Sequence, residues 1–252
     1  MTVLVGGVGQ LFQGDLDLGR VAADRLAAED LGHGVLVEEL HYGAVAVAQR
    51  LQDLAPDALV LIGAEQRGRV PGTVERRRVA ALELDPEAVQ VAVRDAITGY
   101  VTIDLVLEVA AGLGALPART VTIEVEPART DPGEGLSPEA ETGLAAALQL
   151  VRAEARRTPL LGVAEELRGR LAGDRLEPSP ATEAMAELLA ELDGLDREGR
   201  WGRAFSLGER VRHAIAAGAT PERMEHLDWA LWWTLLEELD RLLPVEGVSG
   251  PE

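Results

Sequence analysis

Short apolar runs alternate with amphipathic segments in the first part of the chain. The runs are residues 3–8 (VLVGGV), 35–40 (VLVEEL) and 57–64 (DALVLIGA), and each is typical of a parallel strand. Between them, residues 18–30 and 44–54 carry apolar positions on one helical face. This β-α-β-α-β order predicts a parallel sheet with right-handed crossovers.

A second group of elements follows. Residues 74–84 favour another strand, residues 103–113 a helix, and residues 120–125 a strand whose alternation suits an exposed or edge position. Ser137 is placed to cap a long helix that we expect to end near Arg156. The expected fold class is therefore α/β, a three-layer and mostly parallel sheet with helices on both faces.

The character of the sequence changes beyond Thr158, where Leu, Ala and Glu dominate and no convincing strand occurs. We expect two domains, an α/β domain over residues 1–157 and an all-α C-terminal extension over residues 158–252. Three of the four Trp residues share one helical stripe in this extension, at positions 229, 232 and 233. Such a stripe favours packing in a core or against the first domain over a surface for a partner.

The 252 residues carry a formal net charge of -19 and include no Cys. Disulfides, thiolate metal sites and Cys nucleophiles are therefore excluded. The negative charge disfavours nucleic acids and anionic membrane surfaces as partners, because both are repelled. The chain has no apolar run long enough to insert into a membrane and enters its first strand without a signal peptide, so we expect a cytoplasmic protein.

Glycines and acidic residues follow the first strand, at the carboxyl edge where open α/β sheets collect ligands and reacting groups. They open a series of three motifs: Gly7-Val8-Gly9-Gln10 with an acidic helix start ending in Gly19, Ala58–Ala64 with Pro71-Gly72-Thr73, and Val125-Glu126-Pro127 with Leu136-Ser137-Pro138-Glu139. In this order and spacing they resemble the hydrogenase maturation proteases, which trim the C-terminus of the nickel–iron hydrogenase large subunit. The resemblance covers residues 1–157 and leaves out the helical extension.

The resemblance implies a mechanism and three site positions. The family uses a Glu or Asp at the first helix, an Asp after the central strand and a His before a later helix to contact nickel that the substrate holds. The corresponding positions here are Leu16, Gly63 and Gly99, and no His lies between His41 and His213. Leu and Gly side chains have no donor atoms for a metal. We therefore expect a catalytically degenerate relative, a pseudoenzyme without a metal or cofactor of its own.

A fold that keeps its shape but loses its reacting groups is expected to bind without cleaving. The first hypothesis is thus a non-catalytic assembly factor, scaffold or chaperone, with the hydrogenase large subunit or a related maturation protein as its partner. The alternative is an active, divergent endopeptidase in which Asp15 or Asp17 works with His41 or Glu65 and nickel is contacted only through the partner. A third hypothesis is reuse of the fold for a task unrelated to hydrogenases.

The four candidate crevice residues also have simpler interpretations. For Asp15 and Asp17 we favour helix capping and interaction with the helix dipole. Glu65 reads as a solvated carboxylate at a strand end, and His41 as a structural or surface residue. Asp104 is expected to be a first-turn charge of a helix.

Two further features receive the simpler interpretation as well. The turn at Gly7-Val8-Gly9 lacks the third glycine of a dinucleotide-binding motif, and the acidic residues that follow repel a pyrophosphate. The basic run Arg76-Arg77-Arg78 is expected to be an exposed strand or turn rather than a docking point for an acidic partner segment.

Overall fold

The computed structural model describes residues 1–80, 82, 84, 86–96, 101–172, 177–198, 203–222 and 224–242. The chain divides into two compact units, Met1–Arg156 and Arg157–Glu252, and each is described by itself. Among the described residues, no helix combines the length and the apolar character needed to cross a membrane.

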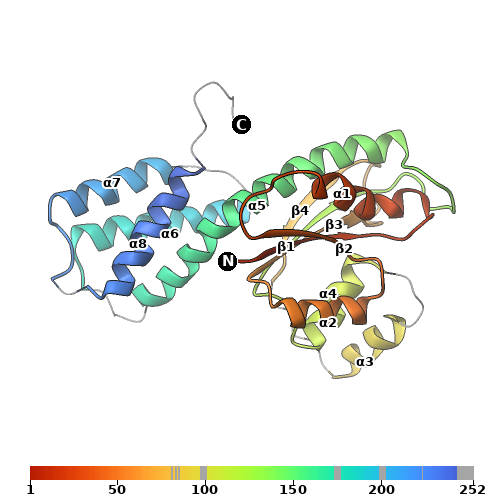
Figure 1. Cartoon of the computed structure of the whole chain (residues 1–252), viewed down its shortest axis with the longest axis horizontal. Coiled ribbons are helices and arrows are strands. Elements are labelled where there is room, and N and C mark those ends of the chain that lie inside the picture. The colour runs from red at the N-terminus through yellow and green to blue at the C-terminus, as the bar shows by residue number, and fades with distance from the viewer. Residues whose placement is uncertain are drawn as a thin grey trace. The chain divides into compact units, whose positions relative to one another are not determined.

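The first unit is built on a five-stranded sheet with the order β2-β1-β3-β5-β4 (Figure 1). Its strands are β1 (Val3–Val8), β2 (Val35–Glu39), β3 (Ala58–Ala64), β4 (Val74–Arg78) and β5 (Arg119–Val125). The first three and β5 pair in parallel, whereas β4 runs antiparallel to β5 at one edge. The mostly parallel sheet expected from the sequence is confirmed.

Helices cover both faces of this sheet (Figure 1). The helical elements of the unit are η1 (Gly14–Asp17), α1 (Leu18–Ala27), α2 (Ala44–Leu54), α3 (Pro86–Asp95), α4 (Ile103–Gly112) and the start of α5 (Pro138–Ala172). On one face Val5 packs with Leu18 of α1 and Leu144 of α5. On the other face Leu4 packs with residues of α2 and α4. Neighbouring residues of a strand thus pack into apolar clusters on opposite faces of the sheet, so the unit has three layers, the sheet and helices on each side of it.

Two expectations for this unit are wrong. Residues 120–125 do not form an edge strand, because β4 pairs outside β5 and every residue of β5 is buried. The strand expected over residues 74–84 ends at Arg78, and α3 was not predicted from the sequence. The missed signal is Pro86 at the first helical position, where its absent N–H costs nothing.

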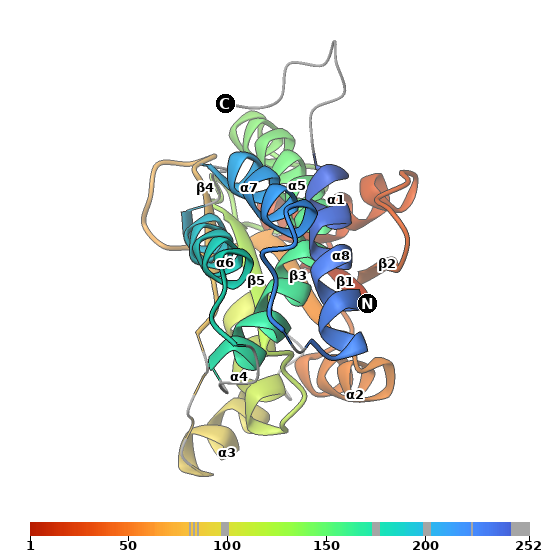
Figure 2. The ribbon, with the colours of Figure 1, turned by 90° about the vertical axis from the view of Figure 1, so that its left-hand side faces the viewer.

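The helix α5 does not end near Arg156 as expected but continues to Ala172 with Pro159 in its interior. It therefore begins in the first unit and ends in the second. The other helices of the second unit are α6 (Pro180–Glu198), α7 (Ala204–Ala216) and α8 (His226–Asp240), seen most clearly in Figure 2.

The second unit has its own apolar cluster, centred on residues such as Met185, Val211 and Trp232. The tryptophan stripe of α8 contributes to it unevenly. Trp232 is fully buried and Trp229 half-buried, but Trp233 is 45% exposed. The core interpretation therefore holds for Trp232 and not for Trp233. Trp201 lies outside the described residues.

Candidate functional site

The carboxyl ends of β1, β3 and β5 lie at one edge of the parallel sheet, where the candidate site was expected. The glycines of the first motif serve packing there. A Cβ on Gly7 would lie 2.1 Å from the carbonyl oxygen of Gly19, and one on Gly19 would lie 1.9 Å from that of Val8. These glycines let α1 lie directly on the backbone of β1, so they form a packing contact and not a phosphate cradle.

Asp15 is fully buried and accepts four hydrogen bonds. Its donors are the backbone N–H groups of Ala128 (2.8 Å), Arg129 (2.9 Å) and Ser137 (2.7 Å) and the hydroxyl of Ser137 (2.8 Å). Burial alone would raise the pKa of Asp15, but hydrogen bonds from Ser137, Arg129 and Ala128 outweigh it and hold the pKa below its ordinary value. Asp15 thus ties η1 to the loop between β5 and α5.

Asp17 occupies the N-cap position of α1, but its side chain makes no capping hydrogen bond. Instead Arg20 donates to both of its carboxylate oxygens at 2.6 to 3.0 Å. The same guanidinium also donates to Asp24 at 3.0 Å. The capping interpretation of Asp17 is therefore wrong, because a guanidinium one turn along the helix binds its carboxylate.

His41 is partly exposed, and its Nδ1 lies 3.2 Å from Oε2 of Glu39. The pKa of Glu39 is raised by burial and by a hydrogen bond and charge repulsion from Asp24, and it is lowered less strongly by His41 and Arg20. Asp24 in turn pairs with Arg20, the partner of Asp17. His41 and Asp17 therefore belong to one surface charge network that joins α1 to the end of β2.

Glu65 is nearly buried at the end of β3, so its interpretation as a solvated carboxylate is wrong. Its Oε1 accepts the backbone N–H of Ile103 at 2.5 Å. Burial raises the pKa of Glu65 to about 7, and the negative charges of Asp104 and Glu124 add to this shift, while the Ile103 N–H and Arg67 oppose it. A carboxyl group with such a pKa gains and loses its proton near neutral pH.

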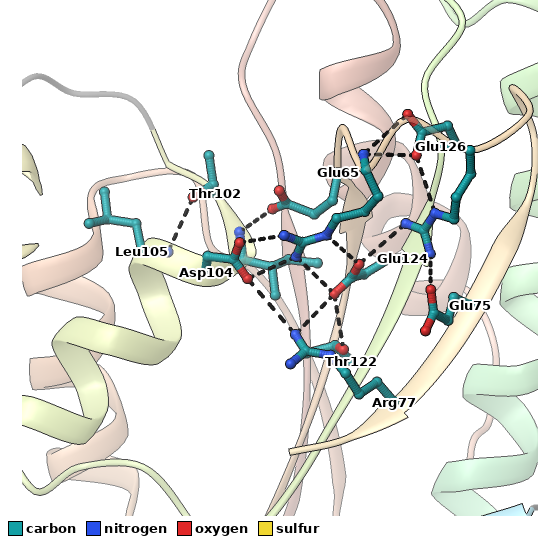
Figure 3. Close-up of polar contacts among 12 residues, drawn as sticks. Glu65, Glu75, Arg77, Thr102, Asp104, Leu105, Thr122, Glu124 and Glu126 are labelled. Atoms are coloured by element: carbon teal, nitrogen blue, oxygen red, sulfur yellow. Dashed lines mark hydrogen bonds and ion pairs between the residues drawn. The ribbon is translucent and has the colours of Figure 1, made fainter. Parts of the chain in front are cut away.

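Beside Glu65 lies a dense set of ion pairs that was not predicted from the sequence (Figure 3). This set consists of Arg67, Arg69, Arg77, Glu75, Asp104, Glu124 and Glu126. The signal for it in the sequence was Glu124 and Glu126, two residues apart at the end of β5, together with Arg67 and Arg69 just after β3. Since these residues come from distant segments, pairing became visible only in the folded chain.

The positions that the resemblance implies for metal contact are Leu16, Gly63 and Gly99, and none of these residue types has a donor atom in its side chain. Leu16 packs against the apolar cluster that includes Leu18. At Gly63, an added Cβ would lie 2.7 Å from the carbonyl oxygen of Val8 and 3.2 Å from Cδ1 of Ile103, so no side chain fits without a shift. Gly99 lies outside the described residues. Within the part of the chain that is described, no three His, Asp or Glu side chains are placed to hold one metal ion.

The four candidate crevice residues have different partners. Asp15 is bound by the loop before α5, Asp17 and His41 lie in the network of α1 and β2, and Glu65 contacts α4. Among the hydrogen bonds and ion pairs of the described residues, none joins two of these four directly.

The three arginines of the basic run, Arg76 to Arg78, differ in exposure and each contacts other parts of the unit. Arg76 is nearly buried and donates to Glu154 of α5 at 2.6 Å. Arg77 is exposed and pairs with Glu124, while Arg78 donates to the backbone carbonyl groups of Val79 and Thr120. The expectation of a wholly exposed run is wrong, because β4 has one face toward α5.

No family model matches the chain, and no curated protein does. Several solved structures are similar to it. The hydrogenase maturating endopeptidase HybD from E. coli is 26% identical with a TM-score of 0.46, and the match covers 63% of this chain and 94% of that one. A hydrogenase 2 maturation peptidase from a Thaumarchaeota archaeon is 25% identical with a TM-score of 0.44, covering 60% and 95%. The [NiFe] hydrogenase maturation protease HybD from Thermococcus kodakarensis is 21% identical with a TM-score of 0.40, covering 62% and 99%. These proteins are of the class that the sequence motifs resemble.

Proposed function

We propose that this hydrogenase maturation protease-like chain binds a nickel–iron hydrogenase large subunit, or a related maturation protein, without cleaving it. In this role it is an assembly factor or scaffold. The observation that carries the proposal is Gly63, which lies where the resemblance implies a metal-contacting Asp. The Val8 carbonyl and the Ile103 side chain leave no room for a side chain there. A chain that cannot contact the metal lacks the group that would couple cleavage to metal insertion.

The neighbouring carboxylates support the same conclusion. Asp15 accepts four hydrogen bonds from the protein itself, and Asp17 is paired with Arg20. Neither carboxylate could coordinate a metal ion without breaking these hydrogen bonds. Leu16 between them packs into an apolar cluster. The same four hydrogen bonds of Asp15 hold the loop before α5 at this edge, which leaves a surface for binding without the reacting groups.

The test is incubation of the full chain with a nickel-loaded large-subunit precursor, followed by size-exclusion chromatography and intact mass measurement. We expect a complex in which the mass of the precursor is unchanged. Nickel-free precursor is the matched control, and we expect it to bind equally well because no metal contact contributes. Loss of a C-terminal peptide from the nickel-loaded precursor would refute the non-catalytic assignment, and absence of any complex would refute the choice of partner.

One observation favours the alternative of an active, divergent endopeptidase. The pKa of Glu65 is raised to about 7, which suits a group that transfers a proton at neutral pH. If the precursor is cleaved, Glu65→Gln should abolish cleavage while Glu75→Gln, at an exposed position, should not. Cleavage that survives Glu65→Gln but is lost in Asp17→Asn would assign the reaction to Asp17 instead.

A further inference from the structure

The first turn of α4 lies against the carboxyl end of β3. Ile103 is fully buried, and its Cδ1 lies beside Gly63. Its backbone N–H donates to Glu65 at 2.5 Å. Thr102 caps the helix by accepting the N–H of Leu105 at 3.2 Å (Figure 3). This turn therefore covers the carboxyl end of β3 at Gly63 and Glu65.

Arg67 and Arg77 both form ion pairs with Asp104 of this turn, and among the described residues Arg67 is the one within hydrogen-bond distance. Arg67 donates to Asp104 through Nη1 at 2.6 Å and through Nη2 at 2.8 Å. It also donates to Glu124 of β5 through Nε at 3.0 Å and through Nη2 at 3.2 Å. The planar fork of arginine makes both double contacts at once, which the single ammonium of lysine does not.

The backbone of Arg67 is fixed as well. Its N–H donates to the carboxylate of Glu126 at 2.9 Å, so the turn after β3 is tied to the end of β5. The two side-chain contacts differ in exposure. The side chain of Asp104 is 44% exposed, whereas that of Glu124 is 4% exposed. Water competes more strongly for the contact with Asp104, although its hydrogen bonds are the shorter ones, 2.6 and 2.8 Å against 3.0 and 3.2 Å for Glu124.

We propose that Arg67 is a latch that holds the first turn of α4 against the carboxyl end of β3. The latch opens by release of Asp104, while Arg67 stays on Glu124. Arg77 does not replace it, because its Nη2 lies 3.8 Å from Asp104, too far for a hydrogen bond. This inference concerns the isolated chain and does not depend on which partner it binds.

Hydrogen–deuterium exchange of the full chain tests the latch, read by mass spectrometry on peptides that contain residues 103–106. Arg67→Gln and Asp104→Asn remove its two sides, and each should speed exchange in this turn by about tenfold. Asp104 is partly exposed, so its variant is expected to fold even if Arg67→Gln does not. Arg69→Gln is the matched control, because the ion-pair partners of Arg69 among the described residues are Glu75, Glu124 and Glu126, and none of them lies in α4. Its exchange in the turn should equal that of the wild type.

The double variant distinguishes a latch from general loosening. If Arg67 and Asp104 act through one contact, the double variant exchanges no faster in this turn than either single variant. The inference is overturned if Asp104→Asn leaves exchange at residues 103–106 unchanged, if the two effects multiply, or if Arg69→Gln accelerates the turn as strongly. Exchange in β1 provides the internal reference and should be the same in all variants.

Discussion

Gly63 and Glu65 lie two residues apart at the end of β3 and show how packing decides the chemistry of one strand end. Gly63 is surrounded by the Val8 carbonyl and the Ile103 side chain. Glu65 is withdrawn from water and holds the N–H of Ile103. The first position has no room for a carboxylate, and the second holds one whose charge is disfavoured by burial. A change at either position is therefore expected to alter stability before it creates activity.

Gly63→Asp is expected to lower the free energy of unfolding by about 2 to 4 kcal/mol, because the new side chain meets Val8 and buries a charge. Gly63→Ala isolates the steric part and should cost about 1 to 3 kcal/mol. Urea unfolding measures both. An Asp variant that is as stable as the wild type and binds nickel would show that the position is open, contrary to the proposed function.

Glu65 should make stability depend on pH in a defined window. Because its pKa is raised from 4.5 to about 7 in the folded state, the folded chain binds this proton more tightly than the unfolded chain. Its contribution is fully present below the unfolded pKa and is lost as pH rises toward 7. Between pH 5 and pH 8, the stability of Glu65→Gln relative to wild type should therefore increase by about 2 to 3 kcal/mol.

Urea unfolding of both proteins at the two pH values measures this change. Glu75→Gln serves as the matched control, since its carboxylate is largely exposed. A relative stability of Glu65→Gln that is the same at both pH values would contradict the assigned protonation behaviour of Glu65.

Among the elements, η1 is joined to the loop before α5 by backbone hydrogen bonds and by one buried side chain, that of Asp15. Asp15 satisfies two backbone N–H groups at residues 128 and 129 and both donors of Ser137. The hydroxyl of Ser137 also accepts the N–H of Ala140 in the first turn of α5. The carboxylate thereby orders the loop and the start of a long helix together.

Asp15→Asn should destabilise the chain by about 2 to 4 kcal/mol, because an amide nitrogen would face N–H donors in a buried site. Limited proteolysis should then cut the loop at residues 128–136 faster than in the wild type. Asp131→Asn, at an exposed position in the same loop, should leave both readouts unchanged. Equal stability of Asp15→Asn and wild type would mean that the four hydrogen bonds are not needed.

On the scale of the whole molecule, each unit has an apolar core drawn from its own residues. Among the described residues, the clusters on the two faces of the sheet contain none beyond Val151, and the cluster of the second unit begins at Leu160. Each unit is therefore expected to have stability of its own that mutations in the other core leave largely unchanged.

Trp232→Ala should lower the thermal transition of the second unit by removing about 3 to 5 kcal/mol of its stability, because a fully buried ring leaves a large cavity. Trp233→Ala on the same helix is the matched control and should cost less than about 1 kcal/mol, because its ring is partly exposed. Differential scanning calorimetry resolves the effect. If Trp232→Ala shifted the unfolding of the α/β unit equally, the two cores would not be independent.

Local patterns predicted much of the fold. The runs at residues 3–8, 35–40 and 57–64 became β1, β2 and β3, because apolar periodicity and glycine breaks depend on near neighbours in the chain. The predictions failed where a distant segment intervened. Pairing with β4 turned the expected edge strand β5 into an interior strand, and α5 continued through Pro159.

The sequence by itself determined the α/β class, the motifs that resemble the hydrogenase maturation proteases, and the lack of donor atoms at Leu16 and Gly63. The contacts of Asp15, Asp17 and Glu65 became visible only in the folded chain. Asp15 meets Ser137, and Arg67 meets Asp104 and Glu124, across long stretches of chain. Burial and ion pairing depend on which segments meet in space, and that information is absent from the spacing of residues along the chain.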